Sequence, residues 1–369
     1  MERAEVLIVG GGPAGSACAA ALAAAGRDAL VIDVAVFPRD KPCAGWITPE
    51  VAAALPMPLD EYGERHVLQP VSRFRIGRID GGAVDVDYGA PVSWGIRRCE
   101  FDCELLRRSG AQVRAGERVA EVGRERGEWV LDGRFAAPML VGAGGHFCPV
   151  SRALNGRANV ATTVVARERE YRLEGEALAR CRVDPERPEL YFCRDLEGYG
   201  WCFRKGPYLN VGLGRRDPRA LGEHVEAFVE FLVREGRIAA PPADGWRGHA
   251  YRLREGRPRR LVGDGVVLVG DAAGLAYAAS GEGILPAVVS GRLAAEAILE
   301  AEGEWSEERL SVYLRRLDER FGPTARRWTL PAPLAGIAGA VLLGSPWFAR
   351  RVVLDRLFLH RVTAGRSGP

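Results

Sequence analysis

The chain has 369 residues, 47% of them hydrophobic, so it can bury a large core and is expected to hold two closely packed domains. Its net charge is only +3 and acidic and basic residues are interspersed, which argues against a nucleic-acid-binding surface. The eight cysteines show no metal-ligand spacing, so we expect no metal site.

The first elements along the chain are predicted to be a strand, a helix and a second strand. Residues 5–9 and 29–33 are apolar runs without alternation, as in parallel strands covered on both faces. An alanine-rich helix over residues 14–25 joins them. Because the first strand starts almost at Met1, with no signal peptide before it, we expect a cytoplasmic protein.

The turn between the first strand and the helix matches the G-x-G-x-x-G fingerprint of dinucleotide-binding sites. Gly10 permits the tight turn, Gly12 lets backbone N–H groups approach a diphosphate, and Gly15 allows close packing of helix and strand. The helix N-terminus adds a partial positive charge. Asp33 ends the second strand, where a carboxylate can accept hydrogen bonds from an adenosine ribose. The residues predicted at this end of the cofactor are Gly10, Gly12, Pro13, Ala14, Gly15 and Asp33.

A proline-rich loop over residues 34–50 follows, and it is too irregular to be a simple connection. It contains Lys41, and only Lys41 and Lys205 are lysine among the 51 basic residues of the chain. A compact ammonium differs from a planar guanidinium in reach and hydration. These two positions therefore either exclude arginine or have kept lysine by chance.

The remaining elements divide the chain into parallel and antiparallel parts. A helix from Arg98 to Arg108 precedes strands near residues 112–122, 128–131 and 139–142. From residue 160 to residue 251 short β-like stretches alternate with turns, which predicts a mostly antiparallel sheet with one helix near residues 218–235. The parallel pattern returns at Val266 and ends in a long helix after Gly283.

The expected fold is α/β, with a Rossmann-type cofactor domain interrupted by a mostly antiparallel β-sheet substrate domain and followed by a helical tail. We assign residues 1–70, 95–158 and 259–320 to the cofactor domain, 71–94 and 159–258 to the substrate domain, and 321–369 to the tail. Within the tail, residues 329–348 are apolar but broken by prolines, which favours packed helices over a membrane span. A basic amphipathic helix follows, with either a solvated face or a membrane-docking face; its arginines are Arg350, Arg351, Arg356 and Arg361.

A second strand–turn–helix motif begins with the apolar residues 266–269. One such turn binds one diphosphate, so two of them far apart in the chain suggest the two ends of one long cofactor, FAD. Asp271 can accept a hydrogen bond from a ribityl hydroxyl. The turn at residues 281–283 can direct backbone N–H groups at the pyrimidine end of the flavin, where negative charge gathers on reduction. The residues predicted at this end are Gly270, Asp271, Gly281, Glu282, Gly283 and Ile284.

Four separated blocks together resemble the geranylgeranyl reductase-related branch of the flavoprotein hydroxylase-like superfamily, and the resemblance covers most of the chain. They are Gly10–Gly15, the loop Lys41-Pro42-Cys43-Ala44-Gly45, the stretch Tyr199–Lys205 with Asn210–Gly214, and Gly270-Asp271 with Ser280–Ile284. The resemblance implies an FAD site in which Lys41, Pro42 and Arg98 lie near the cofactor and Cys43 approaches the flavin. Ala44 and Arg204 depart from the family pattern, which has glycine and proline there. The Asp-Gly pair of the hydroxylases is also missing before His146, which is either an active-site base or a structural residue.

Three residues are predicted to act in catalysis: Cys43, Tyr199 and Trp201. Tyr199 and Trp201 alternate with Phe203 along a predicted strand, so they share one face, which forms either an apolar wall for a lipid-like substrate or ordinary core. A thiol at Cys43 handles protons only if its pKa is lowered; otherwise it packs in the loop.

The leading hypothesis is an FAD-dependent oxidoreductase that reduces carbon–carbon double bonds of an apolar, isoprenoid-like substrate. Flavin N5 delivers the hydride, and Tyr199, Cys43 or water supplies the proton. The alternative is an FAD-dependent monooxygenase of secondary metabolism or peptide modification. A third hypothesis is an FAD-binding protein without turnover. The reductase needs an external electron donor, either NAD(P)H or ferredoxin, and the tail adds a possible peripheral membrane contact.

Overall fold

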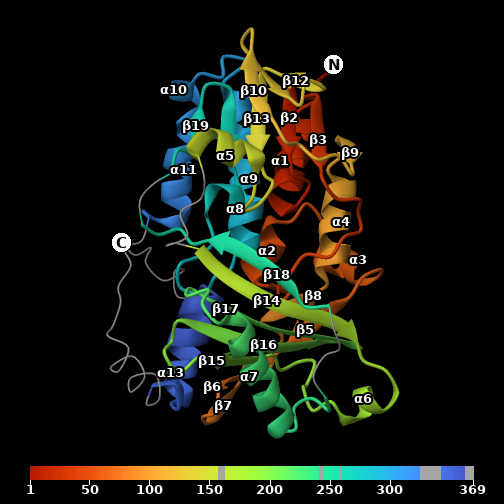
Figure 1. Ribbon diagram of the computed structural model, residues 1–369, viewed down its shortest axis with the longest axis vertical. Coiled ribbons are helices and arrows are strands. Elements are labelled where there is room, and N and C mark those ends of the chain that lie inside the picture. Colours follow the sequence, from red (N-terminus) through yellow and green to blue (C-terminus); the bar gives the residue numbers. More distant parts are fainter. Residues whose placement is uncertain (157–162, 241–244, 257–258, 325–341, 362–369) are drawn as a thin grey trace.

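A computed structural model describes residues 1–156, 163–240, 245–256, 259–324 and 342–361. The molecule is elongated and has two stacked parts (Figure 1). A parallel sheet with its helices occupies one end, and a larger, mostly antiparallel sheet occupies the other (Figure 1). This is the expected α/β fold with a Rossmann-type part and an antiparallel part, and the fold prediction is confirmed.

The first sheet has six strands in the order β19-β20-β13-β2-β3-β9, all parallel except β19. Its strands are β2 (Val6–Val9), β3 (Ala29–Asp33), β9 (Gln112–Ala115), β13 (Met139–Gly142), β19 (Val262–Gly263) and β20 (Val266–Leu268). The central strands are apolar and fully buried, because helices cover the sheet. The strands predicted at residues 29–33 and 139–142 have the predicted bounds.

Two helices run side by side in this part, α1 (Pro13–Ala24) and α9 (Ile284–Glu300). They approach so closely that a Cβ at Gly291 would lie 2.1 Å from the carbonyl oxygen of Ala14. The close packing of these two helices therefore requires a residue without a side chain at Gly291. The other helices of this part are α4 (Arg98–Arg108), α5 (Pro149–Asn155), α8 (Gly270–Ala273), α10 (Glu307–Leu310) and α11 (Val312–Phe321).

The strand predicted over residues 112–122 is wrong beyond Ala115, where β9 ends. The next residues form a turn whose backbone N–H groups at Ala120 and Glu121 donate to the Asp132 carboxylate. A small four-stranded sheet of order β1-β12-β11-β10 follows from this turn. Its strands are β1 (Glu2–Arg3), β10 (Val122–Glu125), β11 (Glu128–Leu131) and β12 (Phe135–Ala137).

The second part is a seven-stranded sheet of order β18-β14-β17-β16-β15-β6-β7, antiparallel except where β15 pairs with β6. Its strands are β6 (Arg73–Arg78), β7 (Ala83–Asp87), β14 (Thr163–Arg172), β15 (Glu189–Phe192), β16 (Gly198–Lys205), β17 (Tyr208–Arg215) and β18 (Arg247–Arg252). Helix α7 (Leu221–Arg234) packs on one face through an apolar core with Phe228 at its centre. Segments far apart in the sequence thus share this sheet, while the predicted domain boundaries themselves stay a prediction.

A three-stranded sheet joins the two parts, with the order β4-β8-β5. Its strands are β4 (Trp46–Ile47), β5 (Leu68–Val71) and β8 (Ser93–Ile96), and the short helices α2 (Pro49–Ala54) and α3 (Leu59–Gly63) pack near it. A further short helix, α6 (Gly175–Arg180), lies at the far end of the antiparallel part (Figure 1).

The C-terminal segment packs against the antiparallel sheet on the side opposite α7. It consists of α13 (Pro346–Phe348) and a wide π-helical turn, η2 (Ala349–Phe358). The apolar side of η2 is buried through Val353, Leu354 and Phe358. Most of the apolar stretch at 329–348 lies outside the described residues, including Pro331 and Pro333. Among the helices that are described, none combines the length and apolar composition that crossing a membrane requires.

Candidate active site

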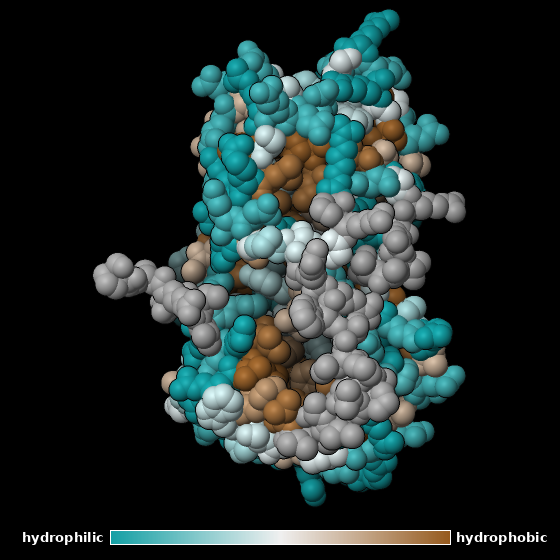
Figure 2. All heavy atoms as spheres, turned by 90° about the vertical axis from the view of Figure 1, so that its left-hand side faces the viewer, coloured by the Kyte–Doolittle hydropathy of each residue, from teal (hydrophilic) through white to brown (hydrophobic). Residues whose placement is uncertain are grey.

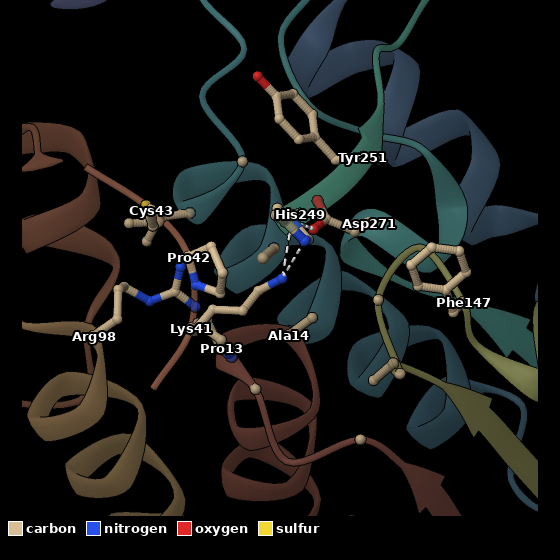
Figure 3. A pocket seen from close by; sticks show the side chains of 18 of the residues that line it. Pro13, Ala14, Lys41, Pro42, Cys43, Arg98, Phe147, His249, Tyr251 and Asp271 are labelled. Atoms are coloured by element: carbon tan, nitrogen blue, oxygen red, sulfur yellow. Dashed lines mark hydrogen bonds and ion pairs between the residues drawn. The ribbon is translucent and has the colours of Figure 1, made fainter. Parts of the chain in front are cut away.

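A cavity of about 630 Å³ lies between the parallel and the antiparallel part. Sixteen of the 18 site residues predicted from the sequence line it, and only Gly15 and Gly270 do not. The residues that line the cavity come from β2, α1, the loop after β3, α4, β14, β16, β18 and the turn before α9. The fold therefore brings both glycine motifs and the catalytic candidates to one place (Figure 3).

The first glycine turn is shaped by close approaches of the backbone. Gly10 has a φ of +112°, and a Cβ there would lie 2.4 Å from the carbonyl oxygen of Ala143. A Cβ at Gly15 would lie 1.8 Å from the carbonyl oxygen of Gly10, so this glycine allows the packing of α1 on the turn. The N-terminus of α1 has no side-chain cap, so its first N–H groups and the helix dipole are available to an anion.

The Asp33 carboxylate is hydrogen-bonded to backbone groups of this chain. It accepts hydrogen bonds from the backbone N–H of Gly11 at 2.7 Å and of Ala35 at 2.8 Å. It thus holds together the two turns that follow β2 and β3. Each oxygen retains a second lone pair, so the predicted contact with a ribose stays a prediction.

The second glycine turn leads into α9, whose N-cap Gly283 gives no side-chain cap. Gly281 has a φ of +74°, and a Cβ there would lie 2.6 Å from the Tyr251 hydroxyl. Gly291, seven residues after Ile284, lies against Ala14 near the start of α1. The first residues of both helices line the cavity, and in α9 the Leu285 N–H already donates to the Glu282 carboxylate at 3.3 Å.

A chain of polar contacts crosses the cavity from Lys41 to Asp271 through His249 (Figure 3). Lys41 Nζ lies 2.9 Å from the imidazole nitrogens, and Nε2 of His249 lies 3.4 Å from Asp271 Oδ2. Burial lowers the pKa of Lys41 to about 8 although Asp271 opposes the shift. Burial and the Lys41 charge lower the pKa of His249, so its neutral imidazole bridges an ammonium and a carboxylate.

Asp271 is only partly exposed, and this partial burial would raise its pKa, but the contact with His249 and the charge of Lys41 lower it overall. Its carboxylate therefore stays ionised at neutral pH. His249 was not among the predicted site residues. Its only sequence signal is its alternation with Tyr251, which also lines the cavity.

Arg98 lies beside the Cys43 loop on the other side of the cavity (Figure 3). Its guanidinium donates two hydrogen bonds to Asp102, at 2.7 and 2.9 Å, and Asp102 also pairs with Arg39 at 3.1 Å. Burial lowers the pKa of Arg98, but the Asp102 charge and the Cys43 sulfur outweigh burial and raise it. Arg98 is thus a fixed cation next to the Cys43 sulfur.

Two residues of β16 and β17 tie the Cys43 loop to the antiparallel sheet. Lys205 is 1% exposed, and its ammonium donates to the carbonyl oxygens of Ala44 at 3.0 Å and Ile96 at 2.9 Å. Asn210 donates to the Cys43 carbonyl oxygen at 3.0 Å. Both residues belong to the recognised motifs but were not predicted as site residues, because these contacts depend on the tertiary structure.

Aromatic side chains form the wall of the cavity next to Cys43. Tyr199 and Trp201 both line it, with ring centroids 6.2 Å apart, whereas Phe203 is only 2% exposed and belongs to the core. Phe358 from η2 stacks on Trp46 at 5.5 Å and meets Tyr199 edge-on at 5.6 Å. Neither Phe358 nor Trp46 was predicted, because their place in the wall depends on how the C-terminal segment folds back.

The Tyr199 hydroxyl donates to the carbonyl oxygen of Ser280 at 2.6 Å, and burial raises its pKa well above the ordinary value. This hydroxyl therefore holds its proton tightly. His146 does not line the cavity, and burial lowers its pKa to about 4. Its neighbour Phe147, 78% exposed, contacts its ring edge-on and does line the cavity.

Comparisons with known proteins place this geometry in a family. The model of the NAD(P)-binding Rossmann-like domain matches residues 8–51. The menaquinone reductase of Mycobacterium tuberculosis is 31% identical over 321 residues, which are 80% of this chain and 76% of that protein. The chloroplastic geranylgeranyl diphosphate reductase of Oryza sativa subsp. japonica is 30% identical over 353 residues, 88% of this chain and 73% of that one. The chain belongs to the geranylgeranyl reductase family.

The crystal structure of a geranylgeranyl bacteriochlorophyll reductase-like protein from Thermoplasma acidophilum superposes with a TM-score of 0.70. It covers 93% of this chain and 87% of that chain at 22% identity, which shows the shared fold. The chain is thus an FAD-dependent oxidoreductase of the geranylgeranyl reductase family, and the predictions of the family and of FAD are confirmed.

The described residues fit FAD. Gly12 leaves the cavity open beside the uncapped N-terminus of α1, where only Arg39 Nη2 comes within 4 Å of an added Cβ, at 3.5 Å. Gly283 leaves room beside Asp271, whose carboxylate suits a ribityl hydroxyl. When bound, FAD supplies hydride transfer from its reduced ring system. We therefore expect the first glycine turn at the diphosphate, Asp271 at the ribityl chain, and residues 281–284 at the ring.

Proposed function

We propose that this reductase reduces a carbon–carbon double bond in the isoprenoid part of an apolar, lipid-like substrate. The observation that carries the proposal is the aromatic wall of Trp46, Tyr199, Trp201 and Phe358 beside Cys43. Such a wall excludes water and favours a hydrocarbon chain over a polar molecule. The names of the two relatives, a reductase of menaquinone and one of geranylgeranyl diphosphate, support a prenyl substrate.

The side chains take distinct parts in this proposal. Tyr199 and Trp201 hold the isoprenoid chain, because they are the flat apolar surfaces of the wall. Cys43 lies at its edge, beside the fixed cation of Arg98, where a thiol can contact the substrate or handle a proton. The hydroxyl of Tyr199 is committed to Ser280, so it orients the ring and is a poor proton donor.

The decisive experiment is anaerobic. Purified holoenzyme is reduced with dithionite and mixed with geranylgeranyl diphosphate or menaquinone, and the products are analysed by mass spectrometry. A product that gains two hydrogen atoms per double bond supports the proposal. Oxygen consumption matched by a hydroxylated product, measured in air, would establish the monooxygenase instead, and reducible FAD with neither product would indicate a binding protein without turnover.

Two further partners belong to the proposal. We expect either NAD(P)H or ferredoxin to reduce the enzyme, and the rate of flavin bleaching with each donor tests which one does.

We also expect the C-terminal segment to touch membranes, where lipid-like substrates reside. Trp347 of α13 is 67% exposed there, and Figure 2 shows an apolar hollow in the half of the molecule where α13 lies.

A further inference from the structure

Glu168 on β14 is a buried carboxyl at the boundary of two cavities. It is 5% exposed and lines both the flavin cavity and a second cavity of about 190 Å³. Lys41, Cys43 and Arg98 also line both, so these four residues form the partition. Glu168 is the only acid among them.

The second cavity is polar and open toward solvent. Its rim includes Arg172 and Arg247, which are exposed, and Arg247 pairs directly opposite Glu168 across β14 and β18. The second cavity therefore gives solvent a route to Glu168 that does not pass the aromatic wall. The other side of the partition faces the flavin cavity, where Tyr199 and Trp201 form part of that wall.

A hydrogen-bonded network fixes the Glu168 carboxyl. Asn210 Nδ2 donates to Glu168 Oε2 at 2.6 Å, and Asn210 Oδ1 accepts from Trp201 Nε1 at 2.7 Å. Asn210 also holds the Cys43 carbonyl oxygen. Through Asn210, the position of the Glu168 carboxyl is therefore fixed relative to both Trp201 of the aromatic wall and the Cys43 loop.

We propose that Glu168 is the proton-transfer residue of this reductase, taking protons from the second cavity and delivering them into the flavin cavity. The inference rests on the proposed reduction of a double bond. That reaction adds a hydride, which arrives with its electron pair from reduced flavin, to one carbon. The π pair of the double bond then forms the second C–H bond with the proton of Glu168. The Glu168 carboxylate regains a proton from water in the second cavity.

The surroundings of Glu168 suit this task. Burial raises its pKa to about 7, Lys205 opposes the shift, and Glu170 and Asp40 add to it. A carboxyl of this kind exchanges protons readily at neutral pH. The charged and titratable groups that face it from all neighbouring elements are Asp40, Lys41, Cys43, Arg98, Glu170, Lys205 and Arg247.

The test begins without substrate. Infrared spectra of holoenzyme labelled with ¹³C-glutamate should show a protonated carboxyl that titrates at about pH 7 and is missing in Glu168→Gln. Glu176→Gln, which removes an exposed glutamate of α6, should keep this band. Glu170→Gln should move the titration to lower pH, because it removes a like charge and frees Lys205 to pair with Glu168.

The free energy of unfolding offers a second readout. Because the folded state holds a proton on Glu168 between the ordinary glutamate pKa and about 7, the wild type should lose stability relative to Glu168→Gln as pH rises through this window. A titration that persists unchanged in Glu168→Gln, or parallel stability curves for the two proteins, would overturn the assignment.

Single turnover of the reduced enzyme with a prenyl substrate completes the test. Glu168→Gln should slow product formation about 100-fold or more while FAD still binds, and Glu168→Asp, which keeps an acid, should recover part of the rate. A Glu168→Gln rate equal to the wild-type rate overturns the inference but leaves the proposed function standing. If the wild type itself reduces no prenyl substrate, the proposed function fails, whatever the infrared titration shows.

Discussion

Lys41, His249 and Asp271 act as one unit, because the protonation of each depends on the next. Burial lowers the pKa of both Lys41 and His249, and His249 in turn helps to keep Asp271 ionised. At neutral pH the unit is an ammonium, a neutral imidazole and a carboxylate. Its net charge is near zero, so it presents Asp271 as an acceptor without adding repulsion to an anionic cofactor.

Asp271→Asn should weaken FAD binding about 10- to 100-fold, which is about 1.4 to 2.8 kcal/mol. The amide cannot replace the carboxylate as a charged acceptor, and Lys41 loses the charge that opposes its deprotonation. Quenching of FAD fluorescence on titration into apoprotein measures the change. Asp217→Asn, a surface change beside Arg219, is the control and should leave the affinity alone. Equal affinities for the two variants would refute this role of Asp271.

Lys205 explains why one of the two lysines persists in an arginine-rich chain. Its ammonium is enclosed by two carbonyl oxygens and Glu170, and a Cβ at Gly45 would lie 2.7 Å from Nζ. A Cβ at Gly95 would lie 2.9 Å from Cγ of the same side chain. Because these backbones approach the Lys205 side chain so closely, we expect a larger planar guanidinium to collide with them and the position to require lysine.

Lys205→Met should lower the free energy of unfolding by about 1 to 3 kcal/mol, because it removes the donor of the Ala44 and Ile96 carbonyl oxygens, whereas Glu170 keeps its ion pair with Arg97. Lys205→Arg should also destabilise, since the guanidinium collides with the two glycine positions. Denaturant unfolding measures both. Arg172→Met, at an exposed arginine, serves as the matched control and should stay within about 0.5 kcal/mol of the wild type. A stable Lys205→Arg protein would contradict the steric account.

At the scale of elements, the central strands of the antiparallel sheet shape the aromatic wall. Trp201 on β16 lies over Gly212 of β17, where a Cβ would come within 2.2 Å of the indole. Two residues further along β17, a Cβ at Gly214 would meet Ala166 at an ordinary 3.5 Å. The two glycines of the N-V-G-x-G motif therefore differ in purpose, although the sequence shows them alike.

Gly212→Ala should destabilise the protein by about 1 to 3 kcal/mol and raise the KM for a prenyl substrate, because it pushes Trp201 out of the wall. Gly214→Ala is the matched control on the same strand and should change both quantities little. Unfolding curves and steady-state kinetics measure the pair. Similar losses for both variants would show that strand geometry, and not the indole, requires the glycine.

The strands of the parallel sheet were predictable, because buried parallel strands carry unbroken apolar runs such as 29–33 and 139–142. The course of the chain after β9 was not predictable, because it depends on hydrogen bonds from the backbone N–H groups of Ala120 and Glu121 to the Asp132 carboxylate. The glycine motifs allowed the cofactor end of the cavity to be predicted, because positions where backbones approach closely require glycine and glycine is visible in the sequence. His249, Phe358 and Glu168 left no such signal, because tertiary contacts alone bring them there.

At the scale of the whole molecule, the cavity exists only because distant segments meet. Its aromatic wall combines Trp46 from β4, Tyr199 from β16 and Phe358 from η2. The C-terminal η2 thus completes a site that begins at the end of β2. The apolar side of η2 is buried in this contact, and the side chain of Arg351 on its outer side is 64% exposed.

The position of this segment leads to a prediction about membranes. The protein should bind phosphatidylserine vesicles at low salt more strongly than phosphatidylcholine vesicles, because the exposed Trp347 of α13 and Arg350 and Arg351 of η2 belong to consecutive elements of the segment that carries Phe358 into the aromatic wall. Arg351→Gln should weaken this binding by about 1 kcal/mol, or about fivefold, in co-sedimentation. Arg107→Gln, on α4 and of similar exposure at 60%, should not. Equal binding to both kinds of vesicle would mean that the arginines of η2 are only a solvated face, and the substrate would then have to reach the cavity through water.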